Sequence, residues 1–537
     1  MLVRFARAVA LFAVLTAVMT WPQVAHLSTD GAPHGDVFFN MWRLGWIAHA
    51  LAKSPAHLLD GNIFYPEPRA LTYSDGVLIE SVLAAPMLWM GVPMVLVHNL
   101  VLLAGIVLSA AGMYVLVSKL TGSGAAAVTA GIVFAFVPYR FDHYMHLELQ
   151  WTVWIPWAFW ALHETFETGA LRHAVLLGVF VALQFMSSVY YGLFLVILLP
   201  VSALLLLCGC RAADTGRSLR ALVIAAATAA VLTAPYLVPY ATTRHSVGPR
   251  PEDQIAMFSA RPSSYRAATL TNYVYGERSA HIGRPERRLF PGVLPLLLAV
   301  VGLLLYQISK EAIMYLIALA IAFEISFGLK GYVFSFLYQH VPAFDGLRAP
   351  ARAGIFVIFF LAVLAAYGQA ALERAARRRT RHVLATIIPL LLLFEYWVAP
   401  LPLIAYPTAA PPLYAWLAQQ PLGIVAELPM PQRNVFAGDE ERFEYMSTFH
   451  WMPLVNGYSG YYPPSYTNRL DRLRTMPSDA ALDSLVADGI RYLIVHTSLY
   501  RGQGATDVLA ALGRHPRFRE LGRFEDGLGY AVVFTVH

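Results

Sequence analysis

The sequence predicts a polytopic α-helical membrane protein of about 11 transmembrane helices, followed by a small soluble α/β domain. Of its 537 residues, 58% are hydrophobic and 13% are charged, whereas a soluble domain typically carries about 25% charged residues. Apolar runs near the length of about 20 residues that crosses a bilayer recur from Leu2 to roughly Pro400. Beyond residue 405, charged residues become frequent and apolar runs shorten to strand length.

The apolar runs predict eleven crossings, each as a helix. We place them at residues 5–21, 92–117, 124–138, 149–163, 172–188, 191–209, 219–240, 290–307, 311–328, 352–372 and 382–400. The first run resembles a signal peptide, but no small-residue cleavage site follows it, so we expect a retained helix. Segment 77–90 is too short to span and is predicted to lie in the outer interface.

Basic residues next to the predicted helix ends indicate the orientation, because Lys and Arg resist translocation. The ends expected in the cytoplasm carry Arg4, Arg7, Lys119, Arg172, Arg211, Arg217, Arg220, Lys310 and the stretch 373–381. The N-terminus is then cytoplasmic and the eleventh crossing exports the C-terminal domain. We expect a multi-pass protein of the bacterial inner membrane with a periplasmic C-terminal domain.

One loop, residues 241–289, conflicts with this rule because it is external in the scheme yet rich in arginine. Its arginines are Arg244, Arg250, Arg261, Arg266, Arg278, Arg284, Arg287 and Arg288. Either the topology is wrong there or function retains them. Guanidinium groups suit a lipid headgroup or a lipid-linked phosphate, and anchoring to headgroups alone stays open.

Charge and cysteine content exclude two other classes. The net charge of +6 does not indicate nucleic-acid binding, because the basic residues are scattered between apolar runs. Cys208 and Cys210 are the two cysteines, so a disulfide framework is excluded elsewhere. With no second pair nearby, we interpret them as ordinary cysteines at a cytoplasmic helix end.

The first external loop, residues 22–76, is long and rich in polar groups, and loops of that length are usually functional or disordered. Val37 to Leu51 has helical apolar spacing, which predicts an interfacial helix with Asp36 at its start. Asp36 is therefore a candidate catalytic carboxylate, and an N-cap role is the structural alternative. His34, two residues earlier, is a candidate substrate-binding residue.

The second external loop, about residues 138–151, is short and combines acidic, basic and aromatic groups. Its candidate residues are Tyr139, Arg140, Asp142, His143, His146 and Glu148. If the loop is helical, Asp142 and His146 share a face one turn apart, which could orient a substrate hydroxyl or hold a divalent metal. None of the strong zinc spacings is present. A wet interfacial loop without catalytic function is the alternative.

A third external segment opens the tenth crossing. Arg348 and Arg352 are expected one turn apart near a helix N-terminus, a geometry that suits phosphate. Snorkelling toward lipid headgroups is the alternative.

The C-terminal part, residues 406–537, is predicted to be an α/β domain, with residues 1–405 forming the membrane domain. Strands are expected at 423–428, 492–496 and 530–536, with a helix at 480–488. An aromatic stretch from Trp451 to Tyr466 could contact a glycan or pack on the rest of the protein.

The order of these parts resembles the GT-C superfamily of membrane glycosyltransferases, such as protein O-mannosyltransferases and lipid A aminoarabinose transferases. Their acidic residue in the first external loop matches His34-Gly35-Asp36 here, and their second functional loop matches residues 139–150. The match covers roughly residues 1–400. The paired acids of the O-mannosyltransferases are absent, so Asp142 and Glu148 are candidates for a second acidic role.

The resemblance implies transfer of a sugar from a polyprenyl-phosphate donor to a glycan, lipid or protein acceptor at the external surface. Asp36 would be the base, and arginines including Arg348 and Arg352 would bind phosphate. Direct displacement would invert the anomeric centre. No cofactor is indicated with certainty, a divalent metal stays open, and no nucleic-acid partner is expected.

Two other classes stay open. A lipid or glycan transporter or flippase would also use arginines, but it should carry ionisable residues near the bilayer midplane. Glu324 is the clearest acidic candidate for that position. A non-catalytic protein of envelope-glycan assembly would need only the aromatic C-terminal stretch.

Overall fold

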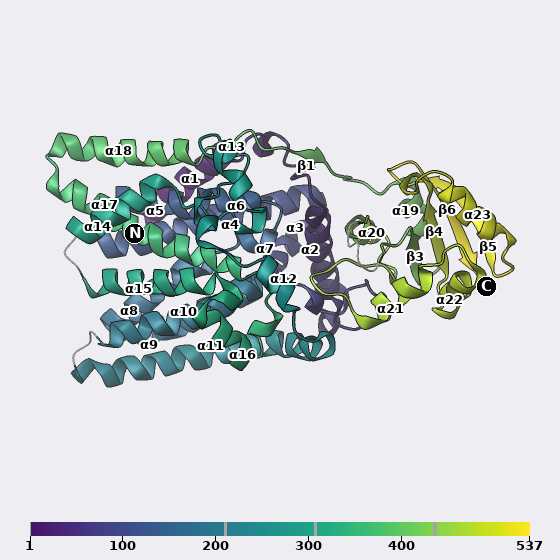
Figure 1. Cartoon of the computed structure of the whole chain (residues 1–537), viewed down its shortest axis with the longest axis horizontal. Helices are drawn as coiled ribbons and strands as arrows, with labels where there is room; N and C mark the ends of the chain where they lie inside the picture. Colours follow the sequence, from purple (N-terminus) through teal and green to yellow (C-terminus); the bar gives the residue numbers. More distant parts are fainter. Residues whose placement is uncertain (1, 209–211, 306–308, 433–437) are drawn as a thin grey trace. The chain divides into compact units, whose positions relative to one another are not determined.

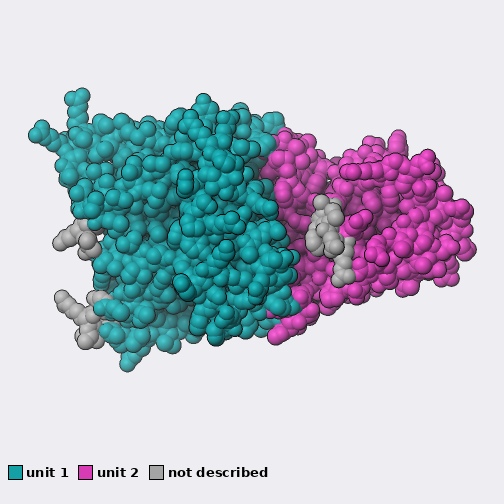
Figure 2. Space-filling model, in the orientation of Figure 1, with its two compact units in different colours: residues 1–26, 100–241, 248–402 teal, residues 27–99, 242–247, 403–537 magenta. Residues whose placement is uncertain are grey.

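The computed structural model describes residues 2–208, 212–305, 309–432 and 438–537. The chain forms two compact units, which Figure 2 colours separately. Unit 1 comprises Met1–His26, Leu100–Ala241 and Gly248–Pro402, and unit 2 comprises Leu27–Asn99, Thr242–Val247 and Leu403–His537. Each unit therefore combines segments that are distant in the sequence.

The regular elements among the described residues of unit 1 are all helices (Figure 1). Its helices are α1 (Leu2–Met19), α5 (Gly124–Phe136), α6 (Pro138–Asp142), α7 (Leu147–Gln150), α8 (Trp154–Thr168), α9 (Leu171–Ser187), α10 (Val189–Cys208), α12 (Glu252–Met257), α13 (Gly276–Ser279), α14 (Val293–Leu305), α15 (Lys310–Ile325), α16 (Tyr332–His340), α17 (Gly354–Ala375) and α18 (Arg378–Glu395). Two more, α4 (Met94–Thr121) and α11 (Ala212–Val247), contribute residues to both units.

Each of the eleven predicted crossings overlaps a helix, although 149–163 covers the end of α7 and most of α8, and residues 209, 306 and 307 lie outside the described residues. Among the described residues, five helical segments are long and apolar enough to cross a bilayer: Met94–Thr121, Gly124–Asp142, Val189–Cys208, Thr215–Val247 and Pro350–Ala375. The chain is thus a multi-pass membrane protein, while the number of eleven crossings stays a prediction. The interfacial segment predicted at 77–90 is also helical, as α3 (Leu78–Trp89).

Helix α17 runs through the core of unit 1, and nearly all of its side chains are buried. It packs against α14 where two glycines face each other. A Cβ on Gly368 would overlap the carbonyl oxygen of Leu298, and one on Gly302 would lie 2.7 Å from that of Leu364. Small residues allow such close approach between membrane helices.

Two of the basic helix ends predicted to share one side, those of Lys119 and Arg217, lie close together in unit 1. Lys119 at the end of α4 pairs with Glu164 (2.8 Å) and Glu167 (2.6 Å) of α8. Arg217 of α11 donates to the carbonyl oxygen of Thr168, next to the same pair. Which side of the membrane this end faces stays a prediction.

The two cysteines and a basic residue considered in the sequence lie at or just beyond the end of α10. Cys208 is the last residue of this helix and is an exposed free thiol. Cys210 and Arg211 lie outside the described residues.

Unit 2 contains the α/β region. Its elements are α2 (Gly35–Lys53), α3, α19 (Pro412–Leu417), α20 (Glu440–Ser447), α21 (Pro464–Leu473), α22 (Asp479–Ala487), α23 (Gly504–Arg514), β1 (Asp30–Gly31), β2 (Ile404–Ala405), β3 (Val425–Leu428), β4 (Tyr492–His496), β5 (Phe518–Glu525) and β6 (Tyr530–Val536). The main sheet has the order β3-β4-β6-β5, with β3 parallel to β4 and the other pairs antiparallel.

The three predicted strands and the predicted helix are present as β3, β4, β6 and α22. Sequence reasoning missed β5, an edge strand whose charged residues face solvent and therefore give no apolar run. The core behind β3, β4 and β6 is filled by apolar side chains of α22 and α23, such as Leu485 and Leu512.

From Leu27 onward, the first external loop folds as part of unit 2. Strand β1 pairs with β2, and the predicted interfacial helix is α2, which packs against α3 and α20. The aromatic stretch predicted at 451–466 packs on this loop: the Trp451 ring stacks on His49 at 4.4 Å and the Tyr466 ring meets Phe64 at 5.0 Å. These rings therefore bury each other.

Candidate functional site

Asp36 lies in the first turn of α2, as predicted, but it is not the N-cap. His34 caps the helix, and its Nδ1 accepts the backbone N–H of Asp36 (3.1 Å). The cap role that we weighed for Asp36 is therefore wrong, because an imidazole already satisfies the free amide. The Asp36 carboxylate stays near the positive end of the helix dipole, which stabilises its charge.

The hydroxyl of Tyr458 donates to Asp36 Oδ1 (2.8 Å). These residues are 422 positions apart, so no spacing in the sequence could have paired them. The Asp36 side chain is 13% exposed, which leaves part of the carboxylate reachable. His34 Nδ1 is 3.8 Å from Asp36 Oδ2.

A second carboxylate, Glu441 of α20, lies against the start of α2. A Cβ on Gly35 would overlap Glu441 Oε1, so only glycine permits this approach. Burial raises the pKa of Glu441 to about 7, and the negative charges of Asp36 and Asp439 add to the effect. Glu441 therefore titrates near neutral pH beside Asp36.

Two further carboxylates of α20 are buried and hold the chain that carries Tyr458. Glu444 Oε1 accepts the backbone N–H of Tyr458 (2.5 Å), and burial raises its pKa well above the ordinary range. Glu440 accepts from the N–H of Gly457 (2.7 Å) and the hydroxyl of Tyr466 (3.0 Å). Burial raises the pKa of Glu440 to about 8. These groups fix the direction of the Tyr458 hydroxyl.

The second loop belongs to unit 1 and differs from the prediction. Helix α6 ends at Asp142 and α7 begins at Leu147, so Asp142 and His146 do not share one helical face. Asp142 Oδ1 accepts from Thr269 Oγ1 (2.8 Å) and from Arg288 Nη1 (3.1 Å). The expected Asp142–His146 pair is therefore replaced by an Asp142–Arg288 ion pair.

The other candidates of this loop are buried. Arg140 donates to the carbonyl oxygens of Phe134 (2.6 Å) and Gln150 (3.2 Å), which ties the loop to the end of α5. The Tyr139 ring lies 4.6 Å from the ring of His143. Glu148 is buried in α7.

Nδ1 of His143 lies 3.2 Å from Nδ1 of His146. The other ring nitrogen of His143, Nε2, lies 3.8 Å from Glu286 Oε1. No group of three or more His, Cys, Asp or Glu residues within the described ranges is placed to hold a metal ion. We therefore assign no metal to these histidines.

Arg348 and Arg352 have different surroundings. Arg352 forms a bidentate ion pair with Glu286, with Nε–Oε1 at 2.8 Å and Nη2–Oε2 at 3.3 Å. Burial by itself would raise the pKa of Glu286, but the positive charges of Arg352 and His143 lower it to about 2. Arg348 precedes a short 3₁₀ helix (Pro350–Ala353) and lies over the Phe258 ring at 5.0 Å. The expected pair of arginines on one helical turn is not formed.

The charged residues at 284–288 of the arginine-rich loop are of two kinds, those that form ion pairs and those that do not. Glu286 and Arg288 pair with partners inside unit 1, as described above. Burial lowers the pKa of Arg287, and the nearby charges of Arg261 and Arg284 lower it further. Arg287 Nε is buried and has no hydrogen-bond partner among the described residues. Arg261, Arg284 and Arg287 form a cationic cluster without an ion pair to any described residue.

Three solved structures resemble the whole chain. Arabinofuranosyltransferase AftD from Mycobacteria matches with a TM-score of 0.63 and 16% identity, over 99% of this chain and 41% of that one. ArnT from Cupriavidus metallidurans, bound to undecaprenyl phosphate, matches with a TM-score of 0.52 and 11% identity, over 98% of each chain. Archaeal oligosaccharyltransferase AglB from Archaeoglobus fulgidus, in complex with an inhibitory peptide and a dolichol-phosphate, matches with a TM-score of 0.50 and 13% identity, over 98% of this chain and 74% of that one.

The chain has the GT-C fold. This confirms the predicted resemblance at the level of architecture, and at these identities it is the fold that is shared. The chain spans about two fifths of the arabinofuranosyltransferase. No protein-family model matches the sequence, and no curated protein shows significant sequence similarity to it.

Proposed function

We propose that this GT-C protein transfers a sugar from a polyprenyl-phosphate donor to an acceptor hydroxyl at the external membrane surface. The observation that carries the proposal is the partly exposed Asp36 carboxylate, held by Tyr458 at the start of an amphipathic helix in a GT-C fold. The lipid phosphates bound to ArnT and AglB support a donor of this class.

Asp36 acts as the general base. It takes the proton of the acceptor hydroxyl while that oxygen attacks the anomeric carbon of the sugar. The bond from this carbon to the phosphate oxygen breaks, and its electron pair leaves with the polyprenyl phosphate. Attack from the side opposite the leaving group inverts the anomeric configuration.

Binding of a lipid phosphate needs cations that are not already neutralised. Within unit 1 we assign this role to Arg261, Arg284 and Arg287, because Arg352 is already paired with Glu286. Guanidinium groups that repel one another gain more free energy by binding a phosphate than does a guanidinium that already pairs with a carboxylate. This replaces the role first expected for Arg348 and Arg352, and it accounts for arginines kept in a loop predicted to be external.

A transporter is less well supported. Both carboxylate oxygens of Glu324 accept the backbone N–H of Val333 at the start of α16, at 3.0 and 3.1 Å. Glu324 therefore caps a helix end and is not placed as a coupling residue at the bilayer midplane.

The test is an assay of the purified full-length protein with a panel of radiolabelled polyprenyl-phosphate sugars and envelope extract as acceptor. The parent should transfer label from one of the sugars. Asp36→Asn should reduce that rate by about 10²–10⁴-fold, the usual cost of losing a general base.

Asp60→Asn is the matched control in the same loop, since Asp60 accepts the backbone N–H of Arg69 (2.8 Å) and an amide oxygen can replace it. Asp60→Asn should keep the parental rate. Transfer by Asp36→Asn at the parental rate would overturn the base assignment, and no transfer by the parent from any sugar would overturn the function.

A further inference from the structure

Arg442 of α20 is a half-buried arginine of unit 2 to which the proposed sugar transfer assigns no role. Its Cζ lies over the Phe38 ring, 5.7 Å from the ring centre. Its Nη2 borders the turn between β5 and β6, where a Cβ on Gly527 would approach it to 3.1 Å. Arg442 forms no hydrogen bond or ion pair with any described residue. Within that part of the chain, its charge therefore has no counter-ion.

The acids of α20 do not neutralise Arg442, because each is held elsewhere. Glu440 and Glu444 accept backbone N–H groups and so hold the segment that carries Tyr458. Glu441 lies against the start of α2. Three acids of the same helix therefore leave this arginine unpaired.

Asp526, in the turn that borders the guanidinium, is occupied as well. Its Oδ2 lies 2.7 Å from Nδ1 of His496. Its Oδ1 accepts the backbone N–H groups of Leu528 and Gly529, each at 2.8 Å. The side chain is buried and serves the turn itself. A counter-ion for Arg442 must come from a bound molecule.

The contact with Phe38 orients the guanidinium without using its hydrogen-bond donors. Arginine interacts with an aromatic ring through its charge and its planar face, and the N–H groups in that plane stay available. Phe38 is itself held by the rings of Tyr406 at 4.7 Å and Tyr445 at 5.5 Å. A guanidinium fixed in this way matches the paired oxygens of a carboxylate or a phosphate.

Arg442 also lies beside the turn that carries the proposed base. Asp36 and Phe38 are both in the first turn of α2, against which α20 packs. Successive residues of α20 contact this turn, Glu441 at Gly35 and Arg442 at Phe38. A substrate whose hydroxyl reaches Asp36 can therefore place an anionic group at Arg442.

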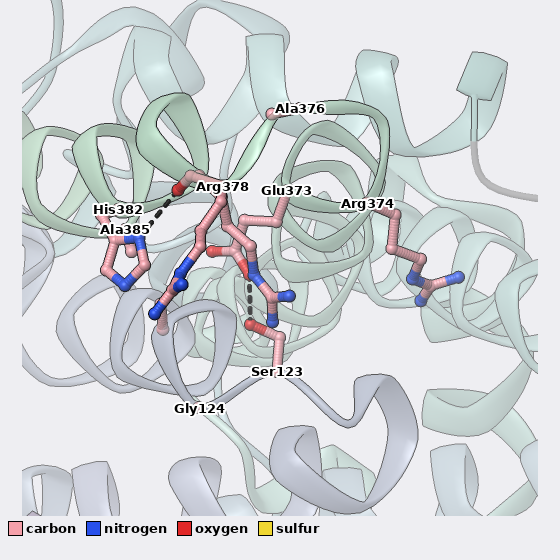
Figure 3. Close-up of a pocket in the computed structure, with 10 residues that line it drawn as sticks. Ser123, Gly124, Glu373, Arg374, Ala376, Arg378, His382 and Ala385 are labelled. Atoms are coloured by element: carbon pink, nitrogen blue, oxygen red, sulfur yellow. Dashed lines mark hydrogen bonds between the residues drawn. The ribbon is translucent and has the colours of Figure 1, made fainter.

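A group of arginines in unit 1 gives a contrast. Figure 3 shows a pocket of about 760 Å³ whose lining includes Arg374, Arg378 and Arg381, at the turn between α17 and α18. This turn follows a helical segment long enough to cross a bilayer, where basic residues are expected from membrane orientation alone. Those arginines need no ligand. Orientation does not account for Arg442, which belongs to the α/β region.

We propose that Arg442 binds a carboxylate or phosphate group of the acceptor while the acceptor hydroxyl lies at Asp36, so that the enzyme selects an acidic acceptor. This inference rests on the proposed function, and it names the acceptor class. The donor phosphate has its own cations in unit 1, which leaves Arg442 for the other substrate. Arg442 also offsets the repulsion that Asp36 and Glu441 exert on an anionic molecule.

The test divides the envelope extract of the transfer assay by anion exchange into a retained, acidic fraction and a neutral flow-through. The purified full-length parent should transfer label to the retained fraction. Amidation of the carboxylates in that fraction, or its treatment with phosphatase, should abolish the transfer and so identify the anionic group. Transfer to the flow-through alone, or transfer that survives both treatments, would overturn this inference and leave the proposed function standing.

Arg442→Gln should raise KM for the retained fraction by about 10–100-fold, the range for hydrogen bonds to a charged group. Its KM for the sugar donor should stay parental. Arg442→Lys keeps the charge but not the planar fork, so its KM for the retained fraction should lie between those of the parent and Arg442→Gln. Arg519→Gln, which removes an exposed arginine of β5, is the control and should keep the parental KM.

Melting temperatures close to that of the parent establish that the variants are folded. A folded Arg442→Gln with parental KM for the retained fraction contradicts the proposal. A higher KM for the donor alone also contradicts it, because Arg442 would then bind the donor phosphate.

Discussion

Two buried carboxylates of unit 1 and the Asp36 carboxylate of unit 2 have different surroundings. In unit 1, each of two buried carboxylates has an arginine: Asp142 pairs with Arg288 at 3.1 Å and Glu286 with Arg352 at 2.8 Å. In unit 2, Asp36 has a tyrosine hydroxyl and, close by, the carboxylate of Glu441. The two acids of unit 1 are held by cations, whereas Asp36 accepts from a neutral hydroxyl.

This difference separates structural acids from a reactive one. Accepting a proton would leave the arginine that holds Asp142 or Glu286 without its charged partner. The Asp36 side chain is more exposed than that of Asp142, 13% against 7%, so an acceptor hydroxyl can reach it more easily. The comparison therefore favours Asp36 over Asp142 as the base, a choice that the sequence left open.

The largest expected effect comes from exchanging the acids for amides in each unit. Asp36→Asn should lower kcat by about 10²–10⁴-fold while thermal stability stays close to that of the parent. Asp142→Asn should keep kcat within about tenfold and lower the melting temperature, because Arg288 loses its charged partner. Rates and melting curves of both variants in the same detergent decide this. If Asp142→Asn lost activity and Asp36→Asn kept it, the comparison would be reversed.

The second largest effect is expected for the cationic cluster of unit 1, Arg261, Arg284 and Arg287. Arg287→Gln should weaken binding of undecaprenyl phosphate by about 10–100-fold, the range for hydrogen bonds to a charged group. Arg266→Gln, an exposed arginine of the same loop, should bind as the parent does. Titration of the lipid against the purified variants measures both affinities. Equal affinity in all three proteins would reduce the cluster to a headgroup anchor.

Tyr458→Phe removes the hydroxyl from Asp36 and keeps the ring that packs on Phe39 at 5.3 Å. We expect kcat to fall by about 3–10-fold, since one charge-assisted hydrogen bond is lost but the carboxylate stays. KM for the sugar donor should not change. Steady-state kinetics separates the two constants, and a rise in KM with unchanged kcat would show that Tyr458 binds substrate instead of positioning Asp36.

The smallest effect concerns pH. The pKa of Glu440 is raised from 4.5 to about 8 in the folded protein, so folding favours its protonated form. Its contribution to stability is complete below about pH 4.5 and is lost as the pH rises through about 8. The melting temperature should therefore fall between those values, and Glu440→Gln should flatten the curve by a few degrees. An unchanged slope in the variant would mean that other groups titrate instead.

Much of the fold follows from patterns that lie within one element. Long apolar runs predict the membrane helices, and the buried strand β4 is found at the predicted residues, Tyr492–His496. The apolar spacing of Val37 to Leu51 predicts helix α2, in whose first turn Asp36 lies. The edge strand β5 was missed because most of its side chains face water.

The candidate site was predictable only in part, and the reason is sequence separation. Asp36 and the arginine-rich loop are visible as polar groups where apolar residues are expected. The partners Tyr458 and Glu441 are not, since both are more than 400 positions from Asp36 and have ordinary neighbours in the chain. Gly35 allows Glu441 to approach, but glycine also occurs at helix starts where nothing approaches the backbone closely.

By itself, the sequence determined that this chain spans a membrane, that an α/β region follows, and that Asp36 begins an amphipathic helix. These properties depend on hydrophobic burial and local periodicity, which neighbouring residues encode. Only the tertiary structure decided which charges are paired. Ion pairs such as Asp142–Arg288 and Glu286–Arg352 join residues from distant segments, and their energy depends on distances and burial that no local pattern contains.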